Sequence, residues 1–232
     1  MQSSRYSRQI MLSQIGQEGQ DRLANAKVLV VGVGGLGSVV SMYLAGAGIG
    51  NIILVDSDVV SISNLQRQVL YTEKEVGMPK VECAARRLMD QNSNVRIETV
   101  YDQLCADNAT ELIGSVDLVM DCTDNFAVRF LIDDTCAALN KPWIYGSIGC
   151  FCGQVSVFGH TSGRRYSHLY PDRESLSAIP PSSAGVIGPV PGVIGSIQAS
   201  EAIKLIAGFG QLLENKLFTI DLESLRSMVI DF

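Results

Sequence analysis

The sequence of 232 residues is poor in charged residues and in histidine, and it has no excess of basic residues. Only 18% of the residues are charged, and the net charge of -6 at pH 7 argues against a nucleic-acid-binding surface. No uninterrupted apolar run is long enough to cross a membrane, and the first 20 residues lack the apolar stretch of a secretion signal. We therefore expect a cytoplasmic protein that binds neither membranes nor nucleic acids.

The composition also indicates a folded chain with part of its surface covered. Hydrophobic residues make up 47% of the sequence and the mean hydropathy is +0.21, which is apolar for a free monomer. Without a secretion signal, the cysteines are expected to be reduced and mostly buried thiols rather than disulfides. There are six of them: Cys83, Cys105, Cys122, Cys136, Cys150 and Cys152.

Short apolar runs alternate with helix-like segments over the first 146 residues. The runs over 27–31 and 51–56 are typical of strands buried on both faces, and they flank a helix expected over 36–47. The same alternation continues with strands expected over 95–100, 116–121 and 142–145, and helices over 79–89, 107–113 (with Asp107 as its N-cap) and 126–139. This pattern predicts an α/β fold, with a Rossmann-like, mainly parallel sheet and flanking helices.

The pattern changes after Gly146. Strands over 153–158 and 216–230, joined by tight turns, predict a C-terminal antiparallel extension. A helix is expected over 193–206. The segment 161–191, rich in serine, glycine and proline, is long for a structureless loop, so we interpret it as functional or mobile.

A glycine-rich motif lies between the first predicted strand and the helix that follows. Its glycines let the backbone approach phosphate groups, and the helix N-terminus attracts negative charge. Asp56 ends the next strand, 19 residues after Gly37, where a carboxylate accepts hydrogen bonds from ribose hydroxyls. The motif predicts a bound nucleotide but does not distinguish a dinucleotide from ATP; close helix–strand packing without a ligand is the alternative. Its glycines are Gly32, Gly34, Gly35 and Gly37.

Groups suited to a polyphosphate follow this acid. Arg67 offers a planar fork to phosphate oxygens, and Lys80 offers a mobile positive charge. Asp124 follows a predicted strand, where a carboxylate beside phosphates suits Mg²⁺. Each residue alone has a simpler interpretation, as a solvated arginine, a surface lysine or a helix cap. Together, at strand ends that face one crevice, they favour ATP with Mg²⁺.

These motifs, with others along nearly the whole chain, resemble the ThiF/MoeB/HesA family of adenylyltransferases, relatives of the ubiquitin-activating enzymes. The resemblance implies one adenylyltransferase domain over 1–232. It consists of an N-terminal arm (1–25), a Rossmann-like nucleotide-binding part (26–147) and a carrier-binding part (148–232) with the loop 161–191 and the final helix. The matching stretches are 5–10, 31–37, 56–58, 63–68, 76–80, 121–125 and 191–204.

The resemblance also implies a substrate and a set of site residues. The substrate is the C-terminal glycine of a small ubiquitin-like sulfur-carrier protein that ends in Gly-Gly. The implied catalytic residues are Arg8, Arg67, Lys80 and Asp124. Arg8 reaches the triphosphate of a neighbouring subunit, which implies a homodimer, and Asp124 also holds Mg²⁺. The implied ATP-binding residues are Gly32, Gly34, Gly35, Gly37, Asp56, Asp58, Ser63, Asn64, Leu65, Gln66, Arg67, Lys80, Asp124 and Asn125.

Two departures from the family pattern carry expectations of their own. Many family members hold a structural zinc ion with two CxxC pairs, but here residues 165–168 replace the first pair and no cysteine follows Cys152. We therefore predict no zinc site. The stretch 179–185 also lacks the cysteine that many relatives use for covalent chemistry. We therefore expect the reaction to stop at the acyl-adenylate, with a separate protein as sulfur donor.

The sequence is compatible with several functions. Activation of a ThiS-type carrier in thiamine biosynthesis is the main interpretation, and the same reaction on a MoaD-type carrier in molybdopterin biosynthesis is the alternative. An NAD-dependent oxidoreductase rests on the glycine motif and Asp56 alone, and the two histidines, His160 and His168, offer it little acid–base chemistry. A non-catalytic partner subunit would be expected to have lost Arg67, Lys80 or Asp124.

Overall fold

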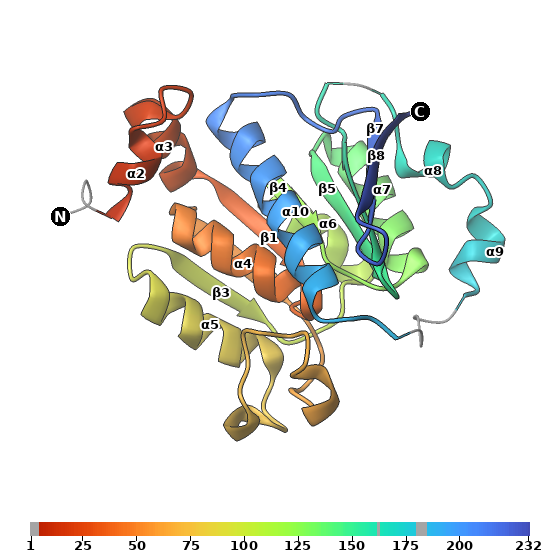
Figure 1. Ribbon diagram of the computed structural model, residues 1–232, viewed down its shortest axis with the longest axis horizontal. Helices are drawn as coiled ribbons and strands as arrows, with labels where there is room; N and C mark the ends of the chain where they lie inside the picture. The colour runs from red at the N-terminus through yellow and green to blue at the C-terminus, as the bar shows by residue number, and fades with distance from the viewer. Residues whose placement is uncertain (1–4, 162, 180–184) are drawn as a thin grey trace.

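The computed structural model describes residues 5–161, 163–179 and 185–232 (Figure 1). Its strands form one eight-stranded sheet in the order β3-β2-β1-β4-β5-β6-β7-β8. β1 to β5 pair in parallel, and β6, β7 and β8 extend the sheet with antiparallel pairing. The predicted α/β fold with an antiparallel C-terminal extension is confirmed. The strands are β1 Lys27–Val31, β2 Asn51–Val55, β3 Arg96–Val100, β4 Leu118–Asp121, β5 Trp143–Gly149, β6 Cys152–Phe158, β7 Lys216–Asp221 and β8 Arg226–Asp231.

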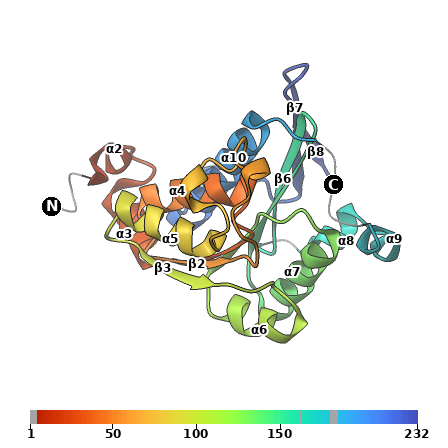
Figure 2. The same ribbon diagram turned by 90° about the horizontal axis from the view of Figure 1, so that it is seen from below.

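Helices cover both faces of the parallel part of the sheet (Figure 2). Alternate residues of β1 explain why, since Val28 and Val30 join the hydrophobic core beneath α4, α5 and α10, whereas Leu29 and Val31 join the core beneath α6 and α7. None of the described helices is both long and apolar enough to cross a membrane. The helices are α2 Ser7–Ile10, α3 Gly16–Asn25, α4 Gly35–Ala47, α5 Lys80–Gln91, α6 Ala106–Gly114, α7 Phe126–Leu139, α8 Tyr166–Leu169, α9 Arg173–Ser177 and α10 Pro189–Ala207, with short 3-10 turns at Ile62–Asn64 and Glu73–Glu75.

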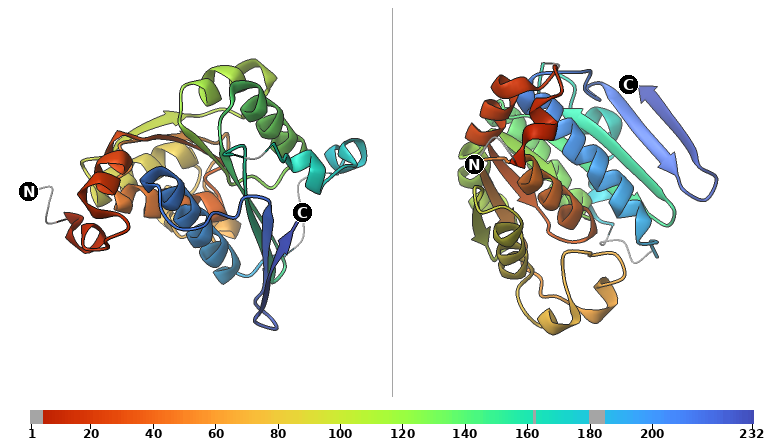
Figure 3. Two further views of the ribbon diagram at one scale, coloured as in Figure 1. Left: turned by 90° about the horizontal axis from the view of Figure 1, so that it is seen from above. Right: turned by 60° about the vertical axis from the view of Figure 1, so that its left-hand side comes forward.

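Two predicted helix starts are wrong. α6 is capped by Cys105 rather than by Asp107, because the Asn108 side chain accepts a hydrogen bond from the Cys105 N–H at 2.9 Å. α10 begins at Pro189, four residues before the predicted start. Its prolines lie in the first turn, where a missing N–H breaks no helical hydrogen bond. α10 packs beside α4 (Figure 3), since a Cβ on Gly195 would lie 2.8 Å from the Cβ of Val39.

The predicted irregular segment 161–191 contains two short helices, α8 and α9, in its described part. Tyr166 is fully buried, with its ring 5.1 Å from that of Phe130, and the neighbouring Arg165 pairs with Asp133 of α7 at 3.0 Å. These contacts fix α8 to the outer helix layer. Residue 162 and residues 180–184 lie outside the described part of the chain.

Half of the cysteines depart from the expected burial. All six are free thiols, and Cys83, Cys122 and Cys136 are buried as predicted. Cys105, Cys150 and Cys152 are exposed, so the prediction is wrong for them. The reason is their place in the fold, since Cys105 precedes a helix and the other two lie at the tip of the β5–β6 hairpin.

Candidate nucleotide-binding site

The glycine motif forms a tight turn between the carboxyl end of β1 and the N-terminus of α4. Gly32 has φ +86°, in the left-handed region that favours glycine. A methyl group on Gly37 would lie 1.9 Å from the Gly32 carbonyl oxygen, so only glycine fits at the start of this helix. The turn is held by Tyr71, whose hydroxyl donates to the Val33 carbonyl at 2.6 Å. Backbone N–H groups at the start of α4 are thus available to a phosphate.

Asp56 lies directly after β2 and supports the same turn. Its carboxylate accepts hydrogen bonds from the N–H groups of Val33 at 2.7 Å and Asp58 at 2.8 Å. Burial raises the pKa of Asp56, while the positive charge of Lys80 and these two hydrogen bonds lower it. Since each carboxylate oxygen has a further lone pair, Asp56 still has acceptors for ribose hydroxyls.

Lys80 is not the exposed lysine of the simpler interpretation. It begins α5, its side chain is only 4% exposed, and its Nζ lies 2.7 Å from a carboxylate oxygen of Asp58. Asp58 is 67% exposed, so the pair lies at the boundary between protein and solvent. A buried ammonium with one exposed partner is well placed to exchange that partner for a phosphate oxygen.

The segment after β2 carries Arg67 to the glycine motif. Its guanidinium donates to the Ser63 carbonyl at 3.2 Å, and its Cγ lies 3.8 Å from the position that a Cβ would take on Gly35. Gln66 of the same segment donates to the Val186 carbonyl at 3.4 Å, which ties it to the chain leading into α10. Arg67 therefore lies beside the N-terminus of α4, and the predicted positions Ser63, Asn64, Leu65 and Gln66 directly precede it on the same segment.

Asp124 lies on the loop after β4, next to the same turn. A Cβ on Gly32 would lie 2.9 Å from the Cys122 carbonyl oxygen, which places this loop against the glycine motif. Asn125 caps α7, since its side chain accepts from the N–H groups of Ala127 and Val128. The Asp124 side chain is exposed and has no hydrogen bond or ion pair to another residue that the structure describes.

The described residues contain no group of three histidine, cysteine or acidic side chains that could hold a metal ion alone. An exposed carboxylate such as that of Asp124 nevertheless fits Mg²⁺, which proteins bind with one or two carboxylates together with phosphate oxygens and water. At residues 165–168, Arg165 pairs with Asp133, and the His168 Nδ1 accepts a hydrogen bond from the Arg165 N–H at 3.0 Å.

Arg8 is the one predicted site residue that the structure does not bring to this edge. Its helix α2 lies at the opposite end of α4, because Gln9 donates to the Ala47 carbonyl at 3.1 Å. α4 has 13 residues and spans roughly 20 Å at 1.5 Å per residue. Arg8 therefore cannot reach the glycine motif of its own chain.

Three further residues lie near this edge; the sequence motifs include Gln68 only as the end of the stretch 63–68, and they give no sign of Tyr71 or Arg129. Gln68 is buried, with Oε1 lacking a hydrogen-bond partner among the described residues, and its Nε2 lies 3.3 Å from where a Cβ on Gly34 would stand. Tyr71 holds the turn, and Arg129 lies beneath the Asp124 loop. No signal in the local sequence identifies Arg129, because the helix 126–139 also carries Asp133 and Asp134.

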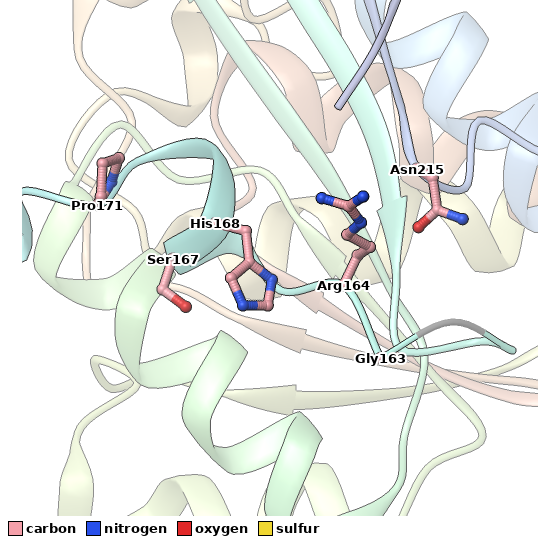
Figure 4. A pocket seen from close by; sticks show the side chains of 6 residues that line it. All are labelled: Gly163, Arg164, Ser167, His168, Pro171 and Asn215. Carbon is pink, nitrogen blue, oxygen red and sulfur yellow. The ribbon is translucent and has the colours of Figure 1, made fainter.

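A separate hollow lies between α8 and the turn before β7 (Figure 4). Its lining residues Gly163 and Arg164 follow the end of β6. At that end Phe158 pairs with Trp143, the first residue of β5, so the hollow lies near the amino-terminal end of β5. This is the edge of the sheet opposite the glycine motif, and none of the predicted nucleotide-binding residues lines the hollow. Its lining residues are Gly163, Arg164, Ser167, His168, Pro171 and Asn215.

Fold and site together define a nucleotide-binding α/β protein. A comparison with models of protein families matches residues 6–231 to the ThiF family. The chain therefore belongs to the ThiF family, as the sequence motifs predicted.

Curated relatives and solved structures are consistent with this family assignment. The chain is 44% identical over 223 residues to the sulfur carrier protein adenylyltransferase of Thermus thermophilus, covering 94% of this chain and 82% of the relative. It is 45% identical over 219 residues to the adenylyltransferase and sulfurtransferase MOCS3 of Culex quinquefasciatus, again 94% of this chain but only half the length of that relative. Among solved structures, E. coli MccB with MccA-N7isoASN has a TM-score of 0.86 at 25% identity, covering 100% of this chain and 72% of that one.

Proposed function

We propose that this chain transfers the adenylyl group of ATP to the C-terminal carboxylate of a small ubiquitin-like sulfur-carrier protein ending in Gly-Gly, with release of pyrophosphate. The observation that carries the proposal is the meeting of the glycine motif, Arg67, Lys80 and Asp124, an exposed carboxylate without a side-chain partner among the described residues, at one edge of the sheet. The names of its relatives, which include a sulfur carrier protein adenylyltransferase and a probable molybdopterin-synthase adenylyltransferase of Porphyra purpurea, support the reaction and the substrate class.

The chemistry needs positive charge more than it needs a general base. A C-terminal carboxyl group has a pKa of about 3.5, so it is already ionised when it attacks the α-phosphorus of ATP. Two unit charges about 4 Å apart repel by about 4 kcal/mol at an effective dielectric constant of 20. Arg67, Lys80 and the N-terminus of α4 offset this repulsion and stabilise the charge that develops on the leaving pyrophosphate. Mg²⁺ held by Asp124 and the phosphates supplies further charge neutralisation when bound.

Carrier identity decides between the two pathways. We infer a ThiS-type carrier in thiamine biosynthesis, with a MoaD-type carrier in molybdopterin biosynthesis as the second candidate, and the name of the Porphyra relative favours the latter. We further infer a separate sulfur donor, because the stretch 179–185 lacks the cysteine that the family resemblance implies for covalent sulfur chemistry. A cytoplasmic location belongs to the same proposal.

Carrier-dependent ATP–pyrophosphate exchange tests this function. We expect exchange only with a carrier that ends in free Gly-Gly, only with Mg²⁺, and more strongly with one of the two carrier types. A carrier that lacks its terminal glycine is the matched control and is expected to give none. If neither carrier supports exchange while NADH fluorescence titration shows binding, the glycine motif serves a dinucleotide and the proposed function is wrong.

We also propose that the chain acts as a homodimer in which Arg8 completes the partner's site. Arg8 cannot reach its own site, and the neighbouring Met11 and Leu12 leave 72% and 54% of their area exposed. Large apolar side chains exposed side by side are typical of a surface that another chain covers. This also accounts for the apolar composition of the sequence.

Mixing two inactive variants tests the exchange of Arg8 between subunits. Arg8→Ala and Asp124→Ala are each expected to lose exchange activity alone. After mixing and equilibration, about a quarter of the wild-type activity is expected to return, since half of the symmetric dimers become mixed and one of their two sites is intact. If mixed dimers form, as shown by differently tagged subunits, and no activity returns, Arg8 does not act on the partner's site.

A further inference from the structure

A buried ion pair lies directly beneath the Asp124 loop. Arg129 on α7 has 4% of its side chain exposed, and its Nε lies 3.3 Å from a carboxylate oxygen of Asp121, which is fully buried at the end of β4. The Arg129 guanidinium also lies 5.4 Å from the ring centroids of Phe126 and of Tyr145. Aromatic rings on a guanidinium restrict its rotation, so this side chain is held in one orientation.

This pair holds Thr123 from both sides. The N–H and the hydroxyl of Thr123 donate to the same oxygen of Asp121, at 3.0 and 2.7 Å. The carbonyl of Thr123 accepts a hydrogen bond from Arg129 Nη2 at 2.6 Å. The peptide plane that joins Thr123 to Asp124 is therefore fixed by the buried pair.

The other neighbour of Asp124 is fixed as well. Asn125 caps α7, so the chain on both sides of Asp124 is anchored by buried or capping hydrogen bonds. The Asp124 carboxylate is the part of this loop left exposed. A rigid backbone holds the exposed Asp124 carboxylate in one direction, which suits the binding of a ligand that needs a defined orientation.

Burial makes this arrangement costly. Two buried charges lose their hydration, and a well-packed apolar pair of similar size is often at least as stable. The stability of the fold alone therefore does not explain why an arginine is buried at position 129. A lysine would balance the charge of Asp121, but its single ammonium lacks the fork that contacts the carboxylate with Nε and the carbonyl with Nη2.

We propose that Arg129 is a positioning residue, which acts through the Thr123 carbonyl to aim the Asp124 carboxylate at the Mg²⁺ that it shares with the ATP phosphates. The proposal rests on the proposed function, because it takes ATP and Mg²⁺ as ligands of this edge. Arg129 itself touches neither the nucleotide nor the metal.

Calorimetric titration of ATP into Arg129→Lys, with and without Mg²⁺, tests the proposal. Affinity without Mg²⁺ is expected to stay at the wild-type value, whereas the gain in affinity that Mg²⁺ brings is expected to fall about 10-fold, as when a group behind a metal ligand is lost. In an Asp124→Asn background, where the ligand is already impaired, Arg129→Lys is expected to cause little further loss. An equal loss of affinity with and without Mg²⁺, or an undiminished Mg²⁺ gain, overturns the proposal.

Arg165→Lys is the matched control. It weakens another arginine–aspartate pair of α7, to Asp133, without touching Thr123, so its Mg²⁺ gain is expected to remain at the wild-type value. If Arg129→Lys fails to fold by circular dichroism, the double variant Asp121→Asn with Arg129→Gln removes both buried charges together and receives the same test and the same expectation.

Failure of the proposed function and failure of the positioning role of Arg129 give different experimental results. Failure of the proposed function shows as wild-type protein without carrier-dependent exchange. Failure of the present inference shows as wild-type protein with normal exchange and Mg²⁺-dependent ATP binding, beside an Arg129→Lys variant whose Mg²⁺ gain is intact.

Discussion

Replacing Asp124 with alanine is expected to lower carrier-dependent ATP–pyrophosphate exchange by at least about 100-fold, the scale on which loss of one group that stabilises developing charge acts. The carboxylate is exposed and has no partner among the described residues, so its removal breaks no contact of the fold. The thermal unfolding midpoint is therefore expected to stay within about 2 °C of wild type, as for other surface substitutions. Initial-rate exchange measurements and calorimetric unfolding check the two halves of this prediction.

Asp90→Ala is the matched control for this variant. Asp90 is also an exposed aspartate, in the last turn of α5 and away from the glycine motif, and exchange is expected to be unchanged. In the absence of Mg²⁺, Asp124→Ala is expected to bind ATP with the affinity of the wild-type protein. The substitution removes only the part of the ATP affinity that depends on the metal ion. Near-normal exchange by Asp124→Ala would show that this carboxylate holds no catalytic metal.

The convergence of the site could be predicted because it follows from local sequence and from one rule of parallel sheets. The apolar run over 27–31 and the glycines after it predict a strand, a tight turn and a helix. Ligands bind outside the carboxyl ends of such strands, so residues that follow different strands are expected to meet. The sequence alone therefore predicts that Arg67, Lys80 and Asp124 lie at one edge of the sheet.

What could not be predicted depends on contacts between distant parts of the chain. Lys80 has the sequence pattern of a surface helix start, and its burial depends on how residues 56–60 fold over α5. α8 forms because Tyr166 packs into a cluster of aromatic side chains from β5, β6 and α7. The serine- and proline-rich sequence around Tyr166 gives no sign of these contacts. Residue types and spacing indicate which groups are present, whereas their partners emerge only in three dimensions.

The same distinction explains why Arg129 was missed. Nothing in its immediate sequence neighbourhood separates a solvated arginine from a buried one, since either fits a helix of mixed composition. Its role appears only when Asp121, at the end of β4, is seen to hold the N–H and hydroxyl of Thr123 while Arg129 holds the carbonyl. Residues that support a site from behind therefore escape motif-based prediction more readily than those that face the ligand.

Lys80→Met is expected to lower exchange by about 100-fold and to raise the KM for ATP, because a charge-assisted contact to phosphate is lost from a site shielded from water. Methionine keeps an apolar stem of similar length, so packing beneath the side chain is largely preserved. Asp58 loses its partner but is 67% exposed and stays hydrated. The free energy of unfolding is therefore expected to fall by less than about 1 kcal/mol, as for other partly exposed ion pairs.

Asp58→Asn separates the two roles that Lys80 has in the structure. If Lys80 acted only by tying the start of α5 to residue 58, breaking the pair from either side would have the same effect on exchange. A role in binding phosphate predicts that Lys80→Met is much the more harmful of the two, because Asp58→Asn leaves the ammonium in place. Lys74→Met, at an exposed lysine six residues earlier, is the control for loss of one positive charge. Equal effects of Lys80→Met and Asp58→Asn would assign Lys80 to the fold rather than to the nucleotide.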